Sequence, residues 1–240
     1  MNSPASRTTE ALSGQLKQLY ANRFAANRQY RDRVWTILVR AFLAKWIPAD
    51  ATVLDLGSGY GEFINNVPAA RRFALDLNPD SRDLVSPEVT FLLHDCATPW
   101  PLAANELDVV FSSNFLEHLP DKASLTAALR EAWRCLRPGG RFIALGPNVR
   151  HIPGAYWDFF DHHIPLSDRS LAEALRISGF DVETRIDRFL PYTMVDSPQY
   201  PLFFLRLYLS LPLVWRLFGQ QFLLVARKTG TSASQDNEKR

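Results

Sequence analysis

The stretch Thr52–Ile64, TVLDLGSGYGEFI, decides the fold of this chain. It begins with a short apolar run around Val53 and Leu54, as expected of a strand buried in a parallel sheet. The run ends in GSGYG, residues 57–61, where glycine at every second position allows a sharp turn and a close approach to a ligand. Helix-compatible residues follow from Glu62, and the free N–H groups of that helix would point into the same space. This order of elements predicts a site for a nucleotide-like cofactor.

The spacing of the glycines separates this site from dinucleotide sites. Those sites favour G-x-G-x-x-G with a pyrophosphate at the helix end, whereas the spacing here is G-x-G-x-G. Asp55 stands two residues before the first glycine. A carboxylate there would repel a pyrophosphate, but it suits a cationic ligand that carries an amino-acid end.

The composition indicates one ordinary globular domain with some additions. The chain has 240 residues, 47% of them hydrophobic and 22% charged, and a formal net charge of +2. This charge gives no argument for a nucleic-acid partner. Cys96 and Cys135 lack metal-ligand spacing, and the first residues contain no apolar segment of the kind found in secretory signals. We therefore expect a reduced, cytoplasmic protein.

Six further apolar runs read as strands and alternate with helical patterns in the first part of the chain. This alternation predicts a parallel sheet that binds its ligand at the carboxyl ends of the strands. Asp76 ends the second run, 19 residues after Gly57 (76 − 57), where a carboxylate can accept hydrogen bonds from a ribose diol. Asp95 and Asn114 also follow strand ends. The expected strands span residues 72–77, 89–93, 107–111, 141–145, 180–186 and 221–227.

Two helical regions flank or interrupt this pattern. Residues 1–47 form an N-terminal extension in which apolar residues recur at helical spacing from Glu10 to Trp46, on either side of a polar stretch. This extension is either a helix pair packed on the domain of residues 48–228 or a lid over the cofactor. The insertion at 187–220 contains an 18-residue apolar run at 201–218, whose arginines and Pro212 argue against a membrane-spanning helix. A helix pair that caps the active site and a surface that docks on a bilayer through 202–218 both remain open. Residues 229–240 read as a disordered tail.

The successive motifs resemble those of class I S-adenosylmethionine (AdoMet)-dependent methyltransferases, in particular the broad type 11 domain. The resemblance rests on VLDLGSGYGEFI, ALDLNPD, HDCATPWPL, LDVVFSSNFLEHL and LRPGGRFIALGPN. It implies a Rossmann-like α/β three-layer sandwich, with a seven-stranded, mostly parallel sheet and an antiparallel C-terminal strand. It also implies AdoMet as cofactor, with Asp95 facing the adenine amino group and the backbone N–H of Cys96 near the ring. The full set of cofactor-binding candidates is Asp55, Gly57, Ser58, Gly59, Gly61, Asp76, Leu77, Asp95, Cys96 and Asn114.

The same resemblance bears on metal binding. Glu117-His118 is similar to a metal-binding pair in ubiquinone-type O-methyltransferases, but Asn114 stands where that group would supply another carboxylate. We therefore expect no metal.

Catalytic candidates lie in the segment that follows the strand at 141–145. Methyl transfer from a sulfonium requires the nucleophile to be held in line with the methyl carbon, and a hydroxyl acceptor must also lose its proton. The segment GPNVRHIPGAYWDFFDHHIPLS, residues 146–167, contains His151, His162 and His163 among aromatic residues. One of them is the expected general base, with preference for His163, because the helix start at Pro165-Leu166-Ser167 should fix its backbone while the aromatic run holds His162 nearer the surface.

The expected function is methyl transfer to a small or lipid- or glycan-linked acceptor, through a hydroxyl oxygen. Two alternatives remain open: a non-catalytic AdoMet-binding partner subunit, and methylation of a carbon or nitrogen of a small metabolite. No nucleic-acid partner is expected, because the charge is low and SSNF stands where an N-P-P-Y-type motif would mark an exocyclic amine acceptor.

Overall fold

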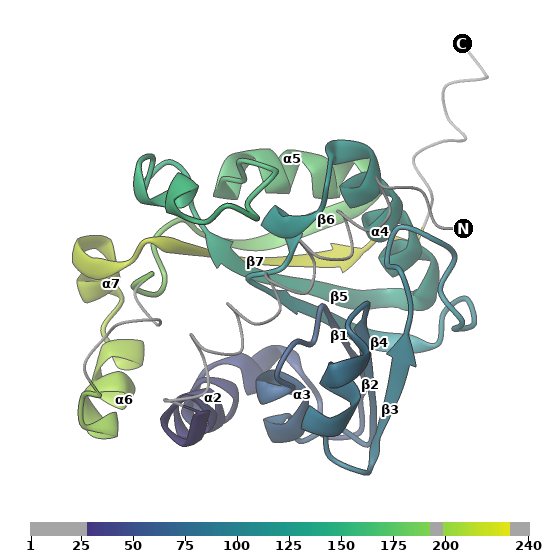
Figure 1. Cartoon of the computed structure of the whole chain (residues 1–240), viewed down its shortest axis with the longest axis horizontal. Coiled ribbons are helices and arrows are strands. Elements are labelled where there is room, and N and C mark those ends of the chain that lie inside the picture. The colour runs from purple at the N-terminus through teal and green to yellow at the C-terminus, as the bar shows by residue number, and fades with distance from the viewer. Residues whose placement is uncertain (1–27, 193–198, 231–240) are drawn as a thin grey trace, which may run out of the picture.

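Seven strands form a single mixed sheet with helices on both faces, in a computed structural model that describes residues 28–192 and 199–230 (Figure 1). The strand order is β3-β2-β1-β4-β5-β7-β6. The strands are β1 (Thr52–Leu56), β2 (Arg71–Asp76), β3 (Val89–Leu93), β4 (Leu107–Ser113), β5 (Leu136–Pro147), β6 (Phe180–Ile186) and β7 (Gln221–Lys228).

The pairing confirms the predicted topology. Strands β1 to β5 run parallel to one another, and β7 runs antiparallel to both β5 and β6. From β1 the chain builds the sheet outward to β2 and β3, and then returns to place β4 on the other side of β1. In open α/β sheets, ligands bind beyond the carboxyl ends of the strands at such a reversal. The glycine turn lies at this reversal, because it follows β1.

The helices divide into two layers that bury opposite faces of the sheet (Figure 1). Val53 of β1 packs in the layer with α2, α3, α6 and α7, whereas Leu54 and Leu56 pack in the layer with α4 and α5. This alternation is that of a strand buried on both faces. The helices are α2 (Arg28–Ala41), α3 (Glu62–Asn66), α4 (Lys122–Cys135), α5 (Asp168–Ile177), α6 (Leu202–Ser210) and α7 (Pro212–Phe218). Short 3₁₀ turns are η1 (Leu43–Trp46), η2 (Pro79–Leu84), η3 (Leu116–His118) and η4 (Ala155–Asp158).

Helix α5 begins and ends as its sequence predicts. The Ser167 side chain accepts a hydrogen bond from the backbone N–H of Ser170 at 3.1 Å, as an N-cap does. Gly179 follows the helix with a φ of +92°, a conformation that costs glycine little.

Several boundaries differ from those expected. Residues 28–33, expected as a polar stretch between helices, are part of α2, and Arg31 among them meets Glu62 of α3. The expected helix around Leu12–Tyr20 lies outside the described residues. Strand β5 begins at Leu136 rather than Arg141, because Leu136 pairs with Leu107 of β4. Thr229, placed in the tail, donates a hydrogen bond to the Gly179 carbonyl at 2.9 Å; residues 231–240 lie outside the described part.

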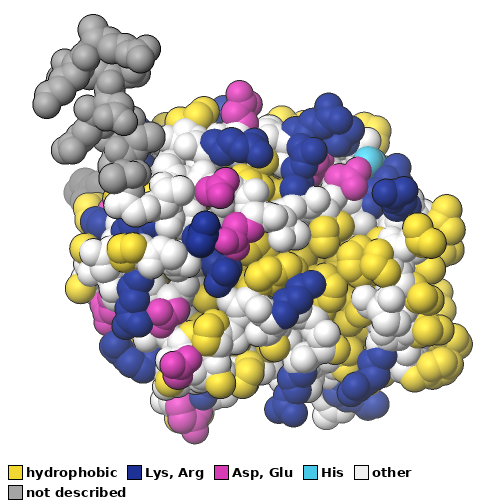
Figure 2. All heavy atoms as spheres, turned by 180° about the vertical axis from the view of Figure 1, so that it is seen from behind, with side chains coloured by type: hydrophobic (Ala, Val, Ile, Leu, Met, Phe, Trp, Pro, Cys, Tyr) yellow, Lys and Arg dark blue, Asp and Glu magenta, His cyan; other side chains and the backbone are white. Residues whose placement is uncertain are grey.

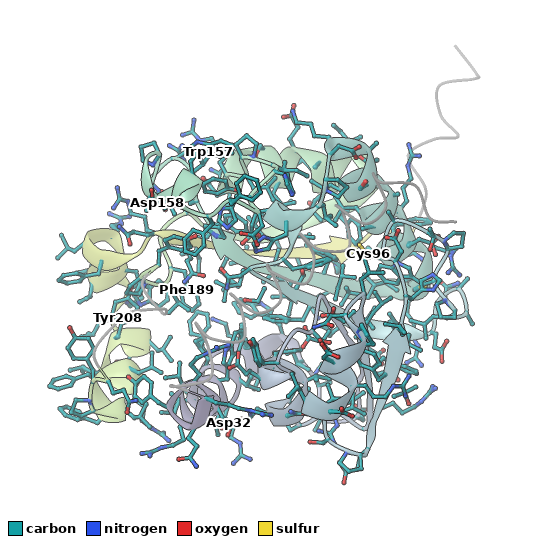
Figure 3. The ribbon with its side chains drawn as sticks, viewed as in Figure 1. Asp32, Cys96, Trp157, Asp158, Phe189 and Tyr208 are labelled. Atoms are coloured by element: carbon teal, nitrogen blue, oxygen red, sulfur yellow. The ribbon has the colours of Figure 1, made fainter. Side chains whose placement is uncertain are left out.

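The insertion at 187–220 contributes α6 and α7. Their inner side joins the core through Leu209 and Trp215, and the Tyr208 hydroxyl donates to the Phe189 carbonyl at 2.6 Å (Figure 3). Along the stretches that the structure describes, no helix has the length and apolar character needed to cross a membrane.

Candidate active site

The glycine turn is built for close approach. Gly57 donates to the Leu75 carbonyl of β2 at 2.9 Å and has a φ of +72°; a Cβ there would overlap the ring of Phe115. At Gly59, φ is +48° and a Cβ would meet no atom within 4 Å. The turn is therefore packed on one side at Gly57 and open at Gly59, as a ligand cradle must be.

Asp76 joins this turn to the end of β2. One carboxylate oxygen accepts the Gly59 N–H at 2.8 Å, and the other accepts the Asn78 N–H at 2.8 Å. Each oxygen keeps acceptor capacity, because a carboxylate offers about four lone-pair directions. The contacts hold the carboxylate in a fixed position, and its binding of a ribose diol remains a prediction. Next to it, the Leu77 side chain is 70% exposed and offers an apolar surface.

The side chains of Ser58, within the turn, and of Asp55, just before it, are buried. The Ser58 hydroxyl is buried and has no hydrogen-bond partner among the described residues, so it can accept or donate to a ligand. Asp55 is 3% exposed. Burial, and then the charge of Asp76, raise the pKa of Asp55 well above its usual value, while a hydrogen bond from the Ile64 backbone lowers it. Asp55 thus lies under the start of α3; its direct contact with a cofactor remains a prediction.

The cradle fits AdoMet on three observations: an unpaired buried hydroxyl at Ser58, open space over Gly59, and a preset carboxylate at Asp76. Gly61, at φ +71°, ends the turn and precedes α3.

Asp95 and Cys96 follow β3. The Asp95 carboxylate is exposed and accepts the Ala97 N–H at 2.9 Å, so it is accessible to a ligand. The Cys96 thiol is buried in the core, and burial raises its pKa to about 12. Figure 3 shows Cys96 on the opposite side of the molecule from Trp157 and Asp158. The thiol is therefore a packing group and no nucleophile; only the backbone of Cys96 remains a cofactor candidate.

Asn114 follows β4 in the left-handed region, with a φ of +47°. Its backbone N–H donates to the Leu145 carbonyl at 2.9 Å, and its side-chain amide donates to the Ser113 hydroxyl at 3.0 Å. A non-glycine residue in this conformation is uncommon and is favoured at binding sites. Its role in cofactor binding remains a prediction.

The three histidines of the segment after β5 occupy different environments. His162 is 7% exposed, and its ring packs against Tyr156 (4.6 Å between centroids), Phe159 (5.1 Å) and His118 (4.9 Å). Its Nδ1 has no hydrogen-bond partner within the described part of the chain, and burial lowers its pKa. An unpartnered basic nitrogen in a buried position is the feature expected of a general base.

His163, rather than His162, is the exposed histidine of the pair. Its side chain is exposed, while its backbone N–H donates to the Glu117 carbonyl at 2.9 Å. The aromatic residues that were expected to hold His162 near the surface instead enclose it, because Tyr156 and Phe159 fold over its ring. The expectation that His162 lies nearer the surface than His163 is therefore wrong. His151 is separate: its Nε2 lies 3.4 Å from Asp187 Oδ2, and burial lowers its pKa.

The sequence marked Glu117-His118 as similar to a metal-binding pair, but it did not show that His162 lies beside them. Both lie in η3 after β4, and together with His162 they offer ligand atoms within 4.8 Å of one another. Burial raises the pKa of Glu117 to about 8 and lowers that of His118 to about 4. His118 Nδ1 lies 2.9 Å from Asp161 Oδ2, and its low pKa makes this a hydrogen bond from a neutral ring rather than an ion pair. The sequence Leu116-Glu117-His118 places two ionisable residues directly after the end of β4, which is the pattern that could have indicated a site.

We expected no metal because Asn114 stands where a third ligand would be. In the structure, His162 lies beside the Glu117–His118 pair and could supply that ligand instead. The absence of a metal stays a prediction.

A second missed group connects α2 to the glycine turn. Arg31 Nη2 donates to Glu62 Oε2 at 2.6 Å, and the Arg31 guanidinium lies 5.1 Å from the centre of the Tyr60 ring. The basic stretch that includes Arg31 was noted in the sequence, but nothing in it marked this residue as buried.

Comparison with known proteins agrees with this geometry. Residues 54–144 match the family described as "Methyltransferase domain". A malonyl-[acyl-carrier protein] O-methyltransferase from Dechloromonas aromatica is 34% identical over 156 residues, which cover 59% of this chain and 58% of that protein. An uncharacterized methyltransferase from Mycobacteroides abscessus is 33% identical over 117 residues, which cover 43% and 44%. The matches thus span about half of the length of these relatives.

Solved structures show the same fold. A SAM-dependent methyltransferase from Archaeoglobus fulgidus aligns with a TM-score of 0.61 and 20% identity, over 85% of this chain and 98% of that one. The protein solved with the Trm112 methyltransferase activator of Haloferax volcanii aligns with a TM-score of 0.64 and 22% identity, over 85% and 94%.

The sheet order, the glycine turn and the strand-end carboxylate define a Rossmann-like AdoMet-binding domain. Residues 54–144 are similar to the methyltransferase domain, and the fold is that of solved SAM-dependent methyltransferases, so the similarity implies AdoMet as the cofactor.

Proposed function

We propose that this protein transfers the methyl group of AdoMet to a hydroxyl oxygen of a small or glycan- or lipid-linked acceptor. AdoMet supplies an electrophilic methyl group on a sulfonium. Asp55, Gly57, Ser58, Gly59, Gly61, Asp76, Leu77, Asp95, Cys96 and Asn114 would hold it, with Asp76 on the ribose and Asp95 at the adenine.

The observation that carries an oxygen acceptor is the buried His162 with its unpartnered Nδ1. An aliphatic hydroxyl needs its proton removed during attack, whereas an amine that is already neutral does not. The malonyl-[acyl-carrier protein] relative is an O-methyltransferase by name, which supports oxygen as the atom methylated. Among the three candidates His151, His162 and His163, we assign the base to His162.

The surroundings of His162 suit this role. Glu117 and His118 lie beside it, and its ring packs against the rings of Tyr156 and Phe159. Because burial lowers its pKa, His162 is neutral at neutral pH and can accept a proton. Tyr156, whose hydroxyl donates to the Ile164 carbonyl and accepts the Leu166 N–H, fixes the segment behind it.

The surface of α6 and α7 supports a lipid-linked acceptor. Phe203, Leu207, Leu213, Leu217 and Phe218 are between 50% and 76% exposed. Figure 2 shows hydrophobic side chains gathered at this edge of the molecule, with Lys and Arg side chains close to them.

No Asp or Glu occurs from Gln199 to Gln220, while Arg206 and Arg216 do. Exposed apolar residues with only positive charges suit an anionic bilayer, to which arginines are attracted and into which apolar side chains insert. We propose that the occupant of this surface is an anionic membrane.

Incubation with labelled AdoMet and a panel of hydroxylated acceptors, free and lipid-linked, tests the function. Label transferred to an oxygen supports it. Label on carbon or nitrogen would establish the alternative chemistry, and AdoMet binding without transfer to any acceptor would favour a partner subunit. The Haloferax volcanii neighbour, solved with an activator, makes addition of a co-expressed partner a useful arm of that screen.

A further inference from the structure

Glu62 presents one satisfied and one unsatisfied carboxylate oxygen at the glycine turn. It is the first residue of α3, directly after Gly61. Its Oε2 accepts a hydrogen bond from Arg31 at 2.6 Å, and its side chain is 13% exposed. Its Oε1 is buried and has no hydrogen-bond partner within residues 28–192 and 199–230. A buried carboxylate oxygen without a donor is costly, so this position calls for an N–H or O–H group from a ligand or water.

The charges around Glu62 favour a cationic donor. Burial, the charge of Asp76 and, more weakly, the charge of Glu62 raise the pKa of Asp55. Burial and the charge of Asp32 raise the pKa of Glu62. Arg31 is the cation that balances this group from α2. A ligand with its own positive charge would relieve the remaining repulsion.

If adenine and ribose bind after β3 and β2, the amino-acid end of AdoMet extends toward Glu62. The candidate ribose and adenine groups, Asp76 and Asp95, follow β2 and β3. The sheet continues from β2 to β1 and β4, so the other end of an extended ligand extends toward the turn after β1. Glu62 lies at the far end of that turn. The AdoMet amino-acid end carries an ammonium group, which offers three donors.

We propose that Glu62 Oε1 accepts a hydrogen bond from the ammonium group of AdoMet. Arg31 is the positioning residue, which keeps Glu62 ionised and fixes the orientation of its carboxylate. This assignment rests on AdoMet as cofactor. It gives α2 a role in cofactor recognition, and it transfers to Glu62 the contact that the sequence suggested for Asp55, whose carboxylate lies beneath α3.

A matched control lies one turn further along the same helix contact. Thr36 donates to Asn66 at 2.6 Å, which joins α2 to α3 without a charge at the turn. Thr36→Val therefore weakens the packing of α2 and leaves Glu62 intact.

The test compares two ligands by calorimetry. S-adenosylhomocysteine carries the amino-acid end, whereas 5′-methylthioadenosine has the same adenosine without it. The ratio of their affinities reports only on the amino-acid end, because partial unfolding lowers both affinities together. In Glu62→Gln, Arg31 still bonds to the side-chain oxygen, so the amide NH₂ faces the ammonium. The ratio should fall roughly 10-fold or more. Arg31→Gln should lower it in the same direction, and Thr36→Val should leave it at the wild-type value.

Other results would overturn the proposal. An unchanged ratio in folded Glu62→Gln would mean that a buried water satisfies Oε1. An equal fall in Thr36→Val would assign the effect to the placement of α2. If wild type binds both ligands equally well, the amino-acid end makes no contact and AdoMet remains the cofactor. If wild type binds neither, the cofactor assignment itself fails.

Discussion

At the scale of single residues, Asp76 shapes the site before any ligand arrives. Its two oxygens hold the N–H groups of Gly59 and Asn78, so the carboxylate and the glycine turn are fixed relative to each other. Such preorganisation reduces the entropy lost on binding.

Replacing Asp76 should therefore weaken cofactor binding strongly. We expect Asp76→Ala to lose about 1.5–3 kcal/mol of binding free energy for S-adenosylhomocysteine, because hydrogen bonds to a charged group are lost. Asp76→Asn, which keeps one acceptor oxygen, should lose less. Calorimetry measures both. Asp83→Ala, an exposed carboxylate in η2, is the control. Wild-type affinity in Asp76→Ala would remove this residue from the site.

His162 should be required for turnover and dispensable for cofactor binding. With an acceptor in hand, His162→Asn should reduce kcat at least about 100-fold, the lower end of the usual contribution of a general base. Burial lowers the pKa of His162, so the wild-type rate should rise with pH below about 6.5, the ordinary value for histidine, and level off above it.

Two comparisons accompany that measurement. His163→Asn and His151→Asn should retain most of kcat, since one side chain is exposed and the other lies beside Asp187. Treatment with a chelator should leave kcat unchanged if no metal is held. Loss of activity after chelation, restored by a divalent ion, would contradict the expectation and point to Glu117, His118 and His162.

At the scale of elements, α6 and α7 have a buried and an exposed side with different tasks. Leu209 and Trp215 pack into the core, whereas Leu213 and Leu217 are 76% and 74% exposed. Variants that test the surface must therefore avoid Leu209.

The exposed side should bind anionic vesicles. Wild type should sediment with phosphatidylserine-containing vesicles at low salt, and less so as salt screens Arg206 and Arg216. Leu213→Glu combined with Leu217→Glu should abolish sedimentation without changing the unfolding temperature. Ile177→Glu, which alters an equally exposed residue at the end of α5, should still sediment. If the wild-type protein stays in the supernatant, the exposed side of α6 and α7 does not bind membranes, and a lid or a subunit contact becomes the better explanation of this surface.

At the scale of the whole molecule, buried ionisable groups link stability to pH. The pKa of Glu117 is about 8 in the folded protein, against an ordinary value of 4.5, so its stabilising contribution is complete below 4.5 and is lost as pH rises through 8. For His118, at about 4 against 6.5, the contribution is complete above 6.5 and is lost as pH falls through 4. Between 4.5 and 6.5 the two slopes oppose each other.

The effect of Glu117 on the free energy of unfolding should be visible above pH 6.5, where His118 no longer opposes it. From pH 6.5 to 8 the free energy of unfolding should fall by about 2 kcal/mol, since one pKa unit corresponds to about 1.4 kcal/mol. In Glu117→Gln this fall should be absent, and the variant should be more stable than wild type at pH 9. Denaturant titrations at several pH values measure it. An identical slope in both proteins would mean that Glu117 is solvated or paired.

The sequence by itself determined the sheet and the cofactor. Sequence patterns located all seven strands: a central strand such as β1 is buried on both faces and is therefore apolar, whereas β6 at the edge alternates apolar and polar residues. The glycine spacing at 57–61 selected the kind of turn. Asp76 could be predicted at the site because the ends of strands can be recognised in the sequence and the carboxyl ends of parallel strands converge on one edge of the sheet.

Only the tertiary structure decided which distant groups meet. His162 and Glu117 lie far apart in the chain, and the choice between His162 and His163 depended on which ring Tyr156 and Phe159 enclose. Two adjacent residues in an irregular segment have no periodicity that fixes their directions. The contact of Arg31 with Glu62 was hidden for a related reason: a basic residue in a polar stretch reads as solvated, and its burial is set by the packing of α2 on α3. Local patterns specify elements, whereas side-chain partners across elements are set by packing.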